Sequence, residues 1–552
     1  MIRRDKPEAV VRVIPPASTA RNAAHPLRRG SDAILCTAIA LVGALTFAAA
    51  MTDPPFSPDS WAYWELSKTI FSGAFYHLTT WRSFQNTIPF SAALPPLWPT
   101  VNACVAAVLS TGPITLMLCN IAVLAAFVAA SAAAGRVAFG NAAVGLVAVL
   151  LSLQDRAWLD ELVAGRSIPL QTVFASLLVA VLASPWPAAR RFGLAGVLCG
   201  LMLANRTDAP ACVAALSLLL LLTPDRRWLP VFAAAACIPV LPWVYYSLTH
   251  FGTVLATDSK PVAMSADPTA FVTDWRPAWA PSLRDAPVMW LHKIYRNAAT
   301  MSGALMAQRP NAWLANLPLA LGAIAALAWQ ARRNGADAPR LVSARASVAL
   351  LAVWLALLAV VPGMLATGYF DERYLAPLSW LTRLIVLGTC CRAVTWLRPR
   401  WPVDMALLVF GMVLAMSRTV VLASLPLALT PAAAFAHPTA DAAILACLTG
   451  QPPGTVMFLD DDTAAARFGA LTGHRAALRP RNLPRLSREQ QREFLRRYDI
   501  GAVTWSSPGG EAIARELGAE RLPGCDNVAR VPLAQRDASP GHASLSSLAP
   551  PE

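Results

Sequence analysis

The run AILCTAIALVGALTFAAAM, residues Ala33 to Met51, is long and apolar enough to cross a membrane as a single helix. Similar runs follow along a chain of 552 residues that is 56% hydrophobic and only 14% charged. A soluble domain usually carries about 25% charged residues, and a membrane barrel would give short alternating strands instead. We therefore expect a mainly α fold, a polytopic bundle of membrane-spanning helices.

The segment before this run, residues 1–31, is a basic tail with Arg3, Arg4, Lys6, Arg12, Arg21, Arg28 and Arg29. Positively charged segments tend to stay in the cytoplasm, so we expect a cytoplasmic tail followed by a transmembrane module over residues 32–426. The end of the run, TFAAAMT, is compatible with signal-peptidase cleavage. Because many further apolar runs follow, we favour an uncleaved anchor.

Short arginine-rich loops predict which ends of the later helices face the cytoplasm. They are AARR (188–191), PDRRW (224–228), ARRNGADAPR (331–340) and LRPR (397–400). The intervening loops should then be external, including 53–93, 250–311 and everything after about residue 426.

One region does not fit this alternation. Residues 113–134 and 137–153 resemble two crossings, whereas the arginine pattern requires an odd number between 112 and 154. Either one of them is a partial or re-entrant helix, or residues 94–153 divide differently. We expect an odd total of about 11 to 13 spans.

The end of the chain reads differently from the bundle. GTVMFLDDD and IGAVTWSS have the composition of strands, and the charged segment LSREQQREFLRRYD between them is helical in pattern. We expect a small extracytoplasmic α/β domain over residues 437–530 and a disordered Ser/Ala/Pro-rich tail over 531–552. Cys447 and Cys525 lie in this external part, where they could form a disulfide or remain free thiols.

Unusual polar clusters gather in the loops that are predicted to be external. They comprise Asp53 and Asp59, then Asp155, Asp160 and Glu161, then Asn205, Arg206 and Asp208, and finally Asp371, Glu372, Arg373 and Tyr374. Membrane-edge loops are polar in any case, which explains some of these residues without a function. Arg206 is harder to explain in that way, because a charge between two apolar runs is costly unless it has a partner.

The first external loop also contains an expected helix, DSWAYWELSKTIFSG, over residues 59–73. Its apolar side chains, Trp61, Trp64, Leu66, Ile70 and Phe71, recur near helical spacing, so we expect an amphipathic helix that lies in the membrane interface. Asp59 at its start is either a functional acid or simply the N-cap of the helix.

Several motifs occur in a common order and on a common side. They are Asp59 with Tyr63 and Gly73, LPPLWP at 94–99, GLMLANRTDAP with Arg206, the Leu241-Pro242-Trp243 segment, and Arg373-Tyr374 followed by Pro377. This pattern resembles the GT-C glycosyltransferases that use polyprenyl-phosphate sugars, such as the lipid A aminoarabinose transferases, the protein O-mannosyltransferases and the rhizobial galacturonosyltransferases. The resemblance extends over about residues 35–530.

Two departures from the family pattern concern specificity. The second external loop of the family often has an acid directly before a proline, whereas Ile168 precedes Pro169 here. The acid and the lysine that some members carry before the second span are also missing from FSAALPPLWP.

The resemblance implies a catalytic role for Asp59 as the base that accepts the proton of the acceptor hydroxyl, with Asp160, Glu161 and Asp53 as secondary acidic candidates. It implies that Arg206, Arg373 and, more weakly, Arg82 bind the donor phosphate. Tyr63, Glu65 and Tyr374 would line the substrate cavity. The one cofactor that it allows is a divalent metal ion between Asp59 and either Asp160 or Glu161.

The expected partners are a polyprenyl-phosphate sugar donor, an acceptor that is an envelope glycolipid (lipopolysaccharide included), a glycan or a protein, and membrane lipids. The expected location is the bacterial inner membrane, with the N-terminus cytoplasmic and the active site periplasmic. A transporter or flippase of a lipid-linked sugar is the alternative, and a glycan polymerase or ligase would share the donor. Nucleic-acid binding is disfavoured, because the basic residues follow the topology of the loops.

Overall fold

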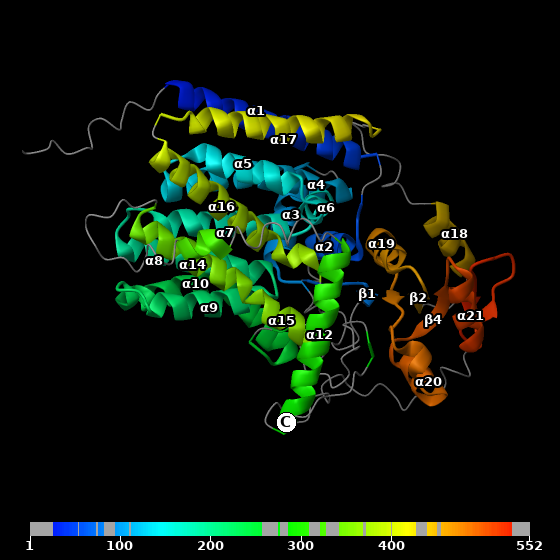
Figure 1. Cartoon of the computed structure of the whole chain (residues 1–552). Coiled ribbons are helices and arrows are strands. Elements are labelled where there is room, and N and C mark those ends of the chain that lie inside the picture. The colour runs from blue at the N-terminus through cyan, green and yellow to red at the C-terminus, as the bar shows by residue number, and fades with distance from the viewer. Residues whose placement is uncertain are drawn as a thin grey trace, which may run out of the picture.

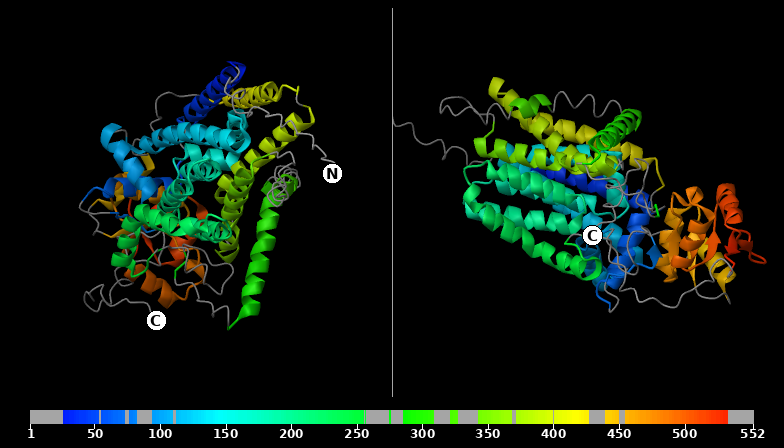
Figure 2. Two further views of the ribbon diagram at one scale, coloured as in Figure 1. Left: turned by 90° about the vertical axis from the view of Figure 1, so that its left-hand side faces the viewer. Right: turned by 90° about the horizontal axis from the view of Figure 1, so that it is seen from below.

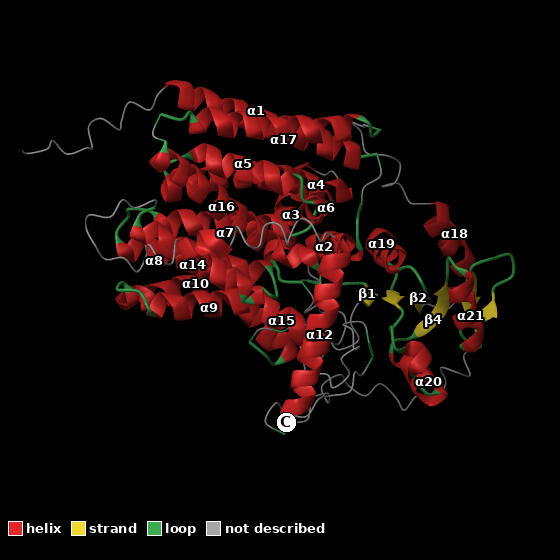
Figure 3. Ribbon diagram, viewed as in Figure 1, coloured by secondary structure: helices red, strands yellow, loops and turns green. Residues whose placement is uncertain are grey.

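The structure is a computed structural model that describes residues 26–52, 55–72, 76–81, 94–109, 112–254, 256, 274–275, 285–308, 321–326, 342–367, 371–398, 400–426, 439–449 and 454–532. Helices lie side by side in a bundle, and a smaller domain that contains the strands lies beyond one end of it (Figures 1 and 3). The two further views in Figure 2 show the same arrangement. We call the end of the bundle next to this domain the domain end, and the other the distal end.

The described part of the bundle consists of helices. They are α1 (Pro26–Ala50), α2 (Pro58–Thr69), α3 (Leu97–Leu109), α4 (Thr115–Phe139), α5 (Ala142–Leu153), α6 (Arg156–Val163), α7 (Ile168–Ala183), α8 (Ala188–Asn205), α9 (Ala209–Leu221), α10 (Leu229–Phe251), α12 (Pro287–Gln308), α14 (Ala344–Leu358), α15 (Val360–Thr367), the short 3-10 helix η3 (Glu372–Leu375), α16 (Ala376–Leu397) and α17 (Val403–Ala423).

Six helical stretches of the described residues are long and apolar enough to span a membrane. They are Gly30–Ala50, Gly112–Phe139, Arg226–Phe251, Ala344–Ala366, Glu372–Leu397 and Val403–Ala423. The pair α5 and α6, bent by 83°, would make a seventh, and α3, α7 and α9 are shorter apolar helices. The prediction of a polytopic helical bundle is confirmed, while the odd total of about 11 to 13 spans stays a prediction.

The region between residues 94 and 153 divides differently from two full crossings. Trp98, at the start of α3, donates from Nε1 to the carbonyl of Gly165 at 2.9 Å, and a Cβ on Gly165 would lie 2.4 Å from Cβ of Leu116, at the start of α4. Both α3 and α4 therefore begin near Gly165, at the domain end. α3 is a short apolar helix, α4 is long enough to span a membrane, and the 12-residue α5 continues into α6 after a bend of 83°.

Glycines allow α8 and α10 to pack closely. A Cβ on Gly196 would lie 2.2 Å from the Phe232 carbonyl oxygen, and a Cβ on Gly200 would lie 2.3 Å from that of Ala236. Small residues four apart on one helix are a common way for membrane helices to approach each other. The spacing holds α8 in place, and α8 ends directly before Arg206.

The domain beyond the bundle is built on a six-stranded sheet of order β1-β3-β2-β4-β6-β5. Its strands are β2 (Thr455–Phe458), β3 (Ala476–Leu478), β4 (Ile500–Thr504), β5 (Glu520–Arg521) and β6 (Val528–Arg530), with helices α18 (Thr439–Leu448), α19 (Asp462–Thr472), α20 (Arg488–Arg497) and α21 (Pro508–Glu516). β1, β3, β2 and β4 pair in parallel, and β6 is antiparallel to both β4 and β5. A disulfide joins Cys447 to Cys525. The predicted α/β domain is confirmed, and the tail after residue 532 lies outside the described residues.

The sixth strand comes from the first loop of the bundle, which sequence reasoning did not predict. β1 (Thr80–Trp81) pairs in parallel with Ala476 and Ala477 of β3. A Cβ on Gly469 of α19 would lie 2.1 Å from Oγ1 of Thr80, so the glycine is needed for this close approach. The loop that follows the first span is thereby part of the extramembrane domain.

The expected interfacial helix is present as α2, but its surroundings differ from the expectation. Residues Ser60 to Ser67 are all buried, because α3 packs on one side of the helix and α19 on the other. Lys68 reinforces this docking by donating from Nζ to the Ala470 carbonyl of α19. The prediction of a helix with one face in lipid is therefore wrong for Trp61, Trp64, Leu66 and Ile70, whose side chains are covered by protein.

Candidate active site

Asp59 lies in the first turn of α2, and it does not cap the helix. Ser57 is the N-cap: its hydroxyl accepts from the backbone N–H of Ser60, and the Ser60 side chain accepts from the backbone N–H of Ser57 in return. Because this capping box satisfies the start of the helix, the Asp59 carboxylate is not needed there. Its Oδ2 instead lies 3.2 Å from Nη1 of Arg373, so the N-cap interpretation of Asp59 is wrong.

Arg373 is the centre of the polar cluster at the domain end. It belongs to η3, and its backbone N–H donates to Oδ1 of Asp371 at 3.1 Å. Its guanidinium faces three carboxylates: Nε lies 2.8 Å from Oδ2 of Asp371, and Nη1 lies 3.2 Å from Asp59 and 3.4 Å from Oε1 of Glu161. The side chain is only 14% exposed, so these charges interact with little screening by water.

Glu161, and not its neighbour Asp160, contributes the second acid. Glu161 is buried, and its Oε1 also lies 2.7 Å from Nη1 of Arg166. Asp160 is half exposed and pairs with Arg156 on the same helix at 3.5 Å. Successive residues of a helix point about 100° apart, so only one of the two can face the cluster. The structure therefore does not place Asp160 with the other candidates.

Contacts from other segments fix the orientation of α6. Asp155 caps the helix by accepting the N–H of Ala157 at 3.2 Å, while its other carboxylate oxygen lies 2.8 Å from Nη2 of Arg383 in α16. At the other end, the buried amide of Asn120 in α4 donates to the Leu162 carbonyl at 2.8 Å. These contacts hold Glu161 toward Arg373.

Arg206 forms the other positive group of the cluster. It follows α8, its Nε donates to Oδ1 of Asp208 at 2.8 Å, and its guanidinium stacks 4.8 Å from the ring centre of Tyr374. The Arg373 guanidinium lies 5.3 Å from the same ring. Tyr374 therefore contacts both arginines, which supports the prediction that these three residues share a site.

Ser167 is a member of the cluster that sequence reasoning missed. Its buried hydroxyl lies 2.8 Å from the Tyr63 hydroxyl and 3.4 Å from Nη1 of Arg206, and its carbonyl accepts from the Asn205 amide at 3.1 Å. A serine at the start of a span is common, so its sequence carried no signal beyond position. Burial raises the pKa of Tyr63, although the charge of Arg206 acts in the opposite direction, so the phenol is neutral at pH 7.

Besides Asp160, three predicted site residues are not brought into the cluster by the described structure. Glu65 accepts hydrogen bonds from the backbone N–H and the hydroxyl of Thr79, so it holds the loop before β1 and not the cavity. Asp53 and Arg82 lie outside the described residues, as does Gly73. The cluster consists of Asp59, Glu161, Asp208 and Asp371 with Arg166, Arg206 and Arg373, together with Tyr63, Ser167 and Tyr374.

The predicted divalent metal does not fit this arrangement. Nη1 of Arg373 lies between Asp59 and Glu161, where an ion bridging the two carboxylates would have to lie. Within the described ranges, no group of three or more His, Cys, Asp or Glu side chains is arranged to hold a metal ion.

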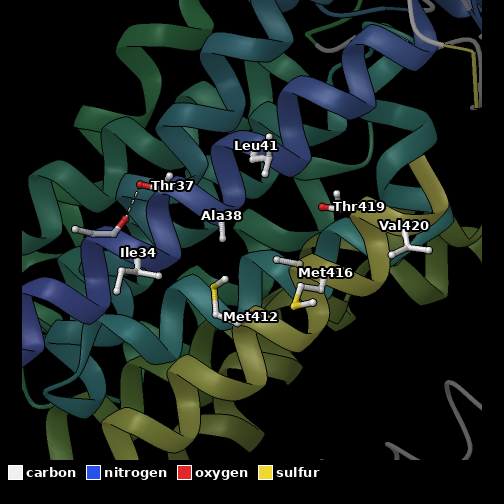
Figure 4. A pocket seen from close by; sticks show the side chains of 10 residues that line it. Ile34, Thr37, Ala38, Leu41, Met412, Met416, Thr419 and Val420 are labelled. Carbon is white, nitrogen blue, oxygen red and sulfur yellow. Dashed lines mark hydrogen bonds between the residues drawn. The ribbon is translucent and has the colours of Figure 1, made fainter. Parts of the chain in front are cut away.

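A cavity elsewhere in the bundle has a different character. α1 and α17 enclose a groove of about 500 Å³, lined by Ala33, Ile34, Thr37, Ala38, Leu41, Met412, Ala415, Met416, Thr419 and Val420 (Figure 4). None of these lining residues is charged, and the Thr37 hydroxyl already donates to the Ala33 carbonyl at 3.0 Å. The groove is therefore mainly apolar and offers no charged group to a phosphate.

No family model matches the chain, and no curated protein sequence is similar to it. Solved structures are similar over most of its length. ArnT from Cupriavidus metallidurans, bound to undecaprenyl phosphate, is 12% identical with a TM-score of 0.53 over 92% of this chain and 99% of its own. The oligosaccharyltransferase AglB from Archaeoglobus fulgidus, in complex with an inhibitory peptide and a dolichol phosphate, is 12% identical with a TM-score of 0.54 over 93% of this chain and 75% of its own.

An oligosaccharyltransferase of the same archaeon, in complex with Zn and sulfate, is 13% identical with a TM-score of 0.52, over 86% of this chain and 67% of its own. At these identities the similarity establishes a shared fold. The chain has the GT-C fold that its motifs predicted.

Proposed function

We propose that this chain is an integral membrane glycosyltransferase that transfers a sugar from a polyprenyl-phosphate donor to an acceptor at the periplasmic face of the bacterial inner membrane. The acceptor is an envelope glycolipid, a glycan or a protein. The observation that carries the proposal is the cluster of Asp59, Glu161, Arg206 and Arg373 at one end of a GT-C bundle. Two solved structures with this fold are complexes with a polyprenyl phosphate, which supports a polyprenyl-phosphate sugar as the donor.

The distribution of charge supports the proposed orientation. Two of the arginine-rich turns, 188–191 and 224–228, lie at the distal end, where Arg191 pairs with Asp225 at 2.7 Å and Arg345 donates to the Ser184 carbonyl. The cluster around Arg373 lies at the domain end. If the arginine-rich turns face the cytoplasm, the cluster and the α/β domain are periplasmic and the N-terminus is cytoplasmic.

Asp59 is the proposed catalytic base. As the acceptor hydroxyl attacks the anomeric carbon of the donor sugar, its proton passes to the Asp59 carboxylate and a new C–O bond forms. The bond between that carbon and the phosphate oxygen breaks, and polyprenyl phosphate leaves with the bonding electron pair. A carboxylate that already pairs with one arginine at 3.2 Å is held in one place for this transfer.

Arg206 is the proposed ligand of the donor phosphate. It shares its charge with one neighbouring carboxylate, Asp208, whereas Arg373 faces three. A planar, permanently charged guanidinium stacked on Tyr374 offers several N–H donors to phosphate oxygens. Arg373 adds positive charge close by, and the Ser167 hydroxyl, which is hydrogen-bonded to Tyr63, lies 3.4 Å from Nη1 of Arg206. Arg82, the third predicted phosphate ligand, stays a sequence-based proposal.

Transfer with the purified protein tests the proposed function. The protein in nanodiscs is incubated with undecaprenyl-phosphate donors that carry labelled aminoarabinose, galacturonic acid or mannose, together with an extract of envelope glycolipids and proteins. We expect label to reach a product from one donor, and none from the corresponding nucleotide sugar. If no donor is used while the protein moves the lipid-linked sugar between leaflets, the chain is a flippase. Mass spectrometry of envelope glycolipids from cells with and without the protein then identifies the natural acceptor.

A further inference from the structure

Two acids from distant parts of the sequence point at one guanidinium nitrogen. Asp59 comes from α2 and Glu161 from α6, and their carboxylate oxygens lie 3.2 Å and 3.4 Å from Nη1 of Arg373. Two carboxylates that converge in this way repel each other unless a cation lies between them. A third carboxylate, Asp371, lies 2.8 Å from Nε of the same side chain. The cation of this site is thus supplied by the chain itself.

A divalent metal ion would compete with this arginine for the same place. Such an ion takes oxygen ligands at about 2.0 to 2.6 Å, so it would have to enter between the carboxylates and displace Nη1. Arg166, 2.7 Å from Glu161, would then add a second positive charge next to the ion. Arg373 is also held firmly, because its backbone N–H donates to Asp371, its guanidinium forms an ion pair with the same carboxylate and its side chain is largely buried.

We propose that the Arg373 guanidinium takes the place of a divalent metal ion in this site. It holds the Asp59 and Glu161 carboxylates in fixed positions, and sugar transfer proceeds without a metal. Because an arginine does not lose its proton in a protein, this cation is present at every working pH. The inference rests on the proposed function, and it assigns Arg373 a positioning role that acts through Asp59.

The proposal predicts what happens when the arginine is removed. Arg373→Ala removes the cation that separates Asp59, Glu161 and Asp371. These carboxylates are not grouped around one position while the guanidinium is present, and without it they can close on one ion with the oxygen ligands that suit Mn²⁺. The variant is therefore expected to gain a Mn²⁺ site that the wild-type protein lacks. A role that is only structural would not create metal binding.

The experiment measures Mn²⁺ binding by electron paramagnetic resonance on the full-length protein in nanodiscs. We expect no stoichiometric Mn²⁺ in the wild type, one bound ion in Arg373→Ala, and loss of that ion in Arg373→Ala/Asp59→Asn. Arg383→Ala is the matched control, because it removes a nearby arginine, in α16, that pairs with a carboxylate outside the cluster, that of Asp155 at 2.8 Å. It is expected to bind no Mn²⁺.

Chelation gives a second readout in the transfer assay. Wild-type transfer should be unchanged by EDTA, and adding Mg²⁺, Mn²⁺ or Zn²⁺ should not accelerate it. Transfer that EDTA abolishes and a metal restores, or a wild-type Mn²⁺ site that Asp59→Asn removes, would overturn the proposal even if Arg373→Ala does not fold. If the wild type uses no donor at all, the proposed function fails, while the Mn²⁺ measurement still decides the role of Arg373.

Discussion

The two ends of the bundle contain the same types of charged residue in different arrangements. At the distal end two arginines face one carboxylate each: the buried Arg191 lies 2.7 Å from Asp225, and Arg136, whose side chain is 72% exposed, lies 3.8 Å from Asp32. At the domain end one guanidinium, that of Arg373, faces three carboxylates from three segments. An exposed pair such as that of Arg136 contributes little to stability, whereas breaking a buried network is costly.

This difference indicates which end of the bundle contains the functional site. Charges at the distal end suffice to orient the helices in a membrane, and each needs no more than one neighbour to do so. Charges at the domain end are held by helix caps, by an aromatic ring and by one another, which is how a site fixes groups for chemistry. Substitutions at the two ends should therefore differ in their effects on transfer and on stability.

Replacing Asp59 should have the largest effect on transfer. Asp59→Asn keeps the size of the side chain and removes the proposed base, so we expect the rate of transfer to fall by about 10²–10⁴-fold. The measurement is label transfer by protein that elutes as a single folded species. Asp225→Asn, at the distal end, is the matched control and should transfer at the wild-type rate. Equal losses in both variants would show that the two ends do not differ in function.

Removing Arg206 should weaken transfer by less. Arg206→Ala deletes the proposed phosphate ligand but leaves the base in place, and we expect a loss of about 10²-fold, as for one oxyanion-stabilising donor. Initial rates at several donor concentrations separate binding of the donor from the chemical step. Arg206→Lys should recover part of the loss, since it keeps a charge without the fork of donors. If Arg206→Ala transfers normally, the phosphate lies elsewhere.

Adjacent acids on α6 provide the sharpest stability comparison. Glu161→Gln should lower the free energy of unfolding by about 3 kcal/mol, because it removes the buried carboxylate that pairs with Arg166 and one of the three that face Arg373. Asp160→Asn, at a half-exposed position one residue earlier, should change it by less than about 0.5 kcal/mol. Denaturant unfolding in detergent measures both. Similar values for the two variants would contradict the assignment of Glu161 to the network.

These comparisons also explain what the sequence could predict. Composition predicts the apolar runs, and loop charge predicts the side on which the polar clusters gather. Motif order predicts that Asp59, Arg206, Arg373 and Tyr374 belong to one site. The choice between Asp160 and Glu161 did not, because it depends on the helical phase of α6. That phase is set by the Asp155 cap and by Asn120, which lies about forty residues away in the sequence.

Two further features have almost no local signal. β1 is only two residues long, and it exists because Gly469 of α19 lets Thr80 approach β3. α3 is as apolar as a span, but its position depends on the hydrogen bond from Trp98 to Gly165. Both are decided by contacts between segments that are far apart in the chain, so the local pattern predicts no strand at residues 80–81 and a membrane span after residue 94.

Alkaline pH should affect the domain end through Tyr63. Its pKa is raised in the folded protein, chiefly by burial, so the folded state keeps its proton where an unfolded chain begins to lose it, near pH 10. Unfolding then releases a proton, and stability falls as pH rises above that value. Tyr63→Phe should flatten the dependence of the apparent melting temperature on pH between about 9 and 11. A variant with an unchanged alkaline slope would exclude Tyr63 as its source.

Removing Arg136 should have the smallest effect, and it bears most directly on the comparison. Its side chain is mostly exposed, and its 3.8 Å separation from Asp32 is too long for a strong ion pair. Arg136→Ala should therefore change the free energy of unfolding by less than about 0.5 kcal/mol and leave transfer unchanged. Denaturant unfolding of Arg136→Ala and of Glu161→Gln then compares the change in the free energy of unfolding at the two ends. A cost near that of Glu161→Gln would mean that the distal pairs are also a network, and charge density alone would no longer mark the functional end.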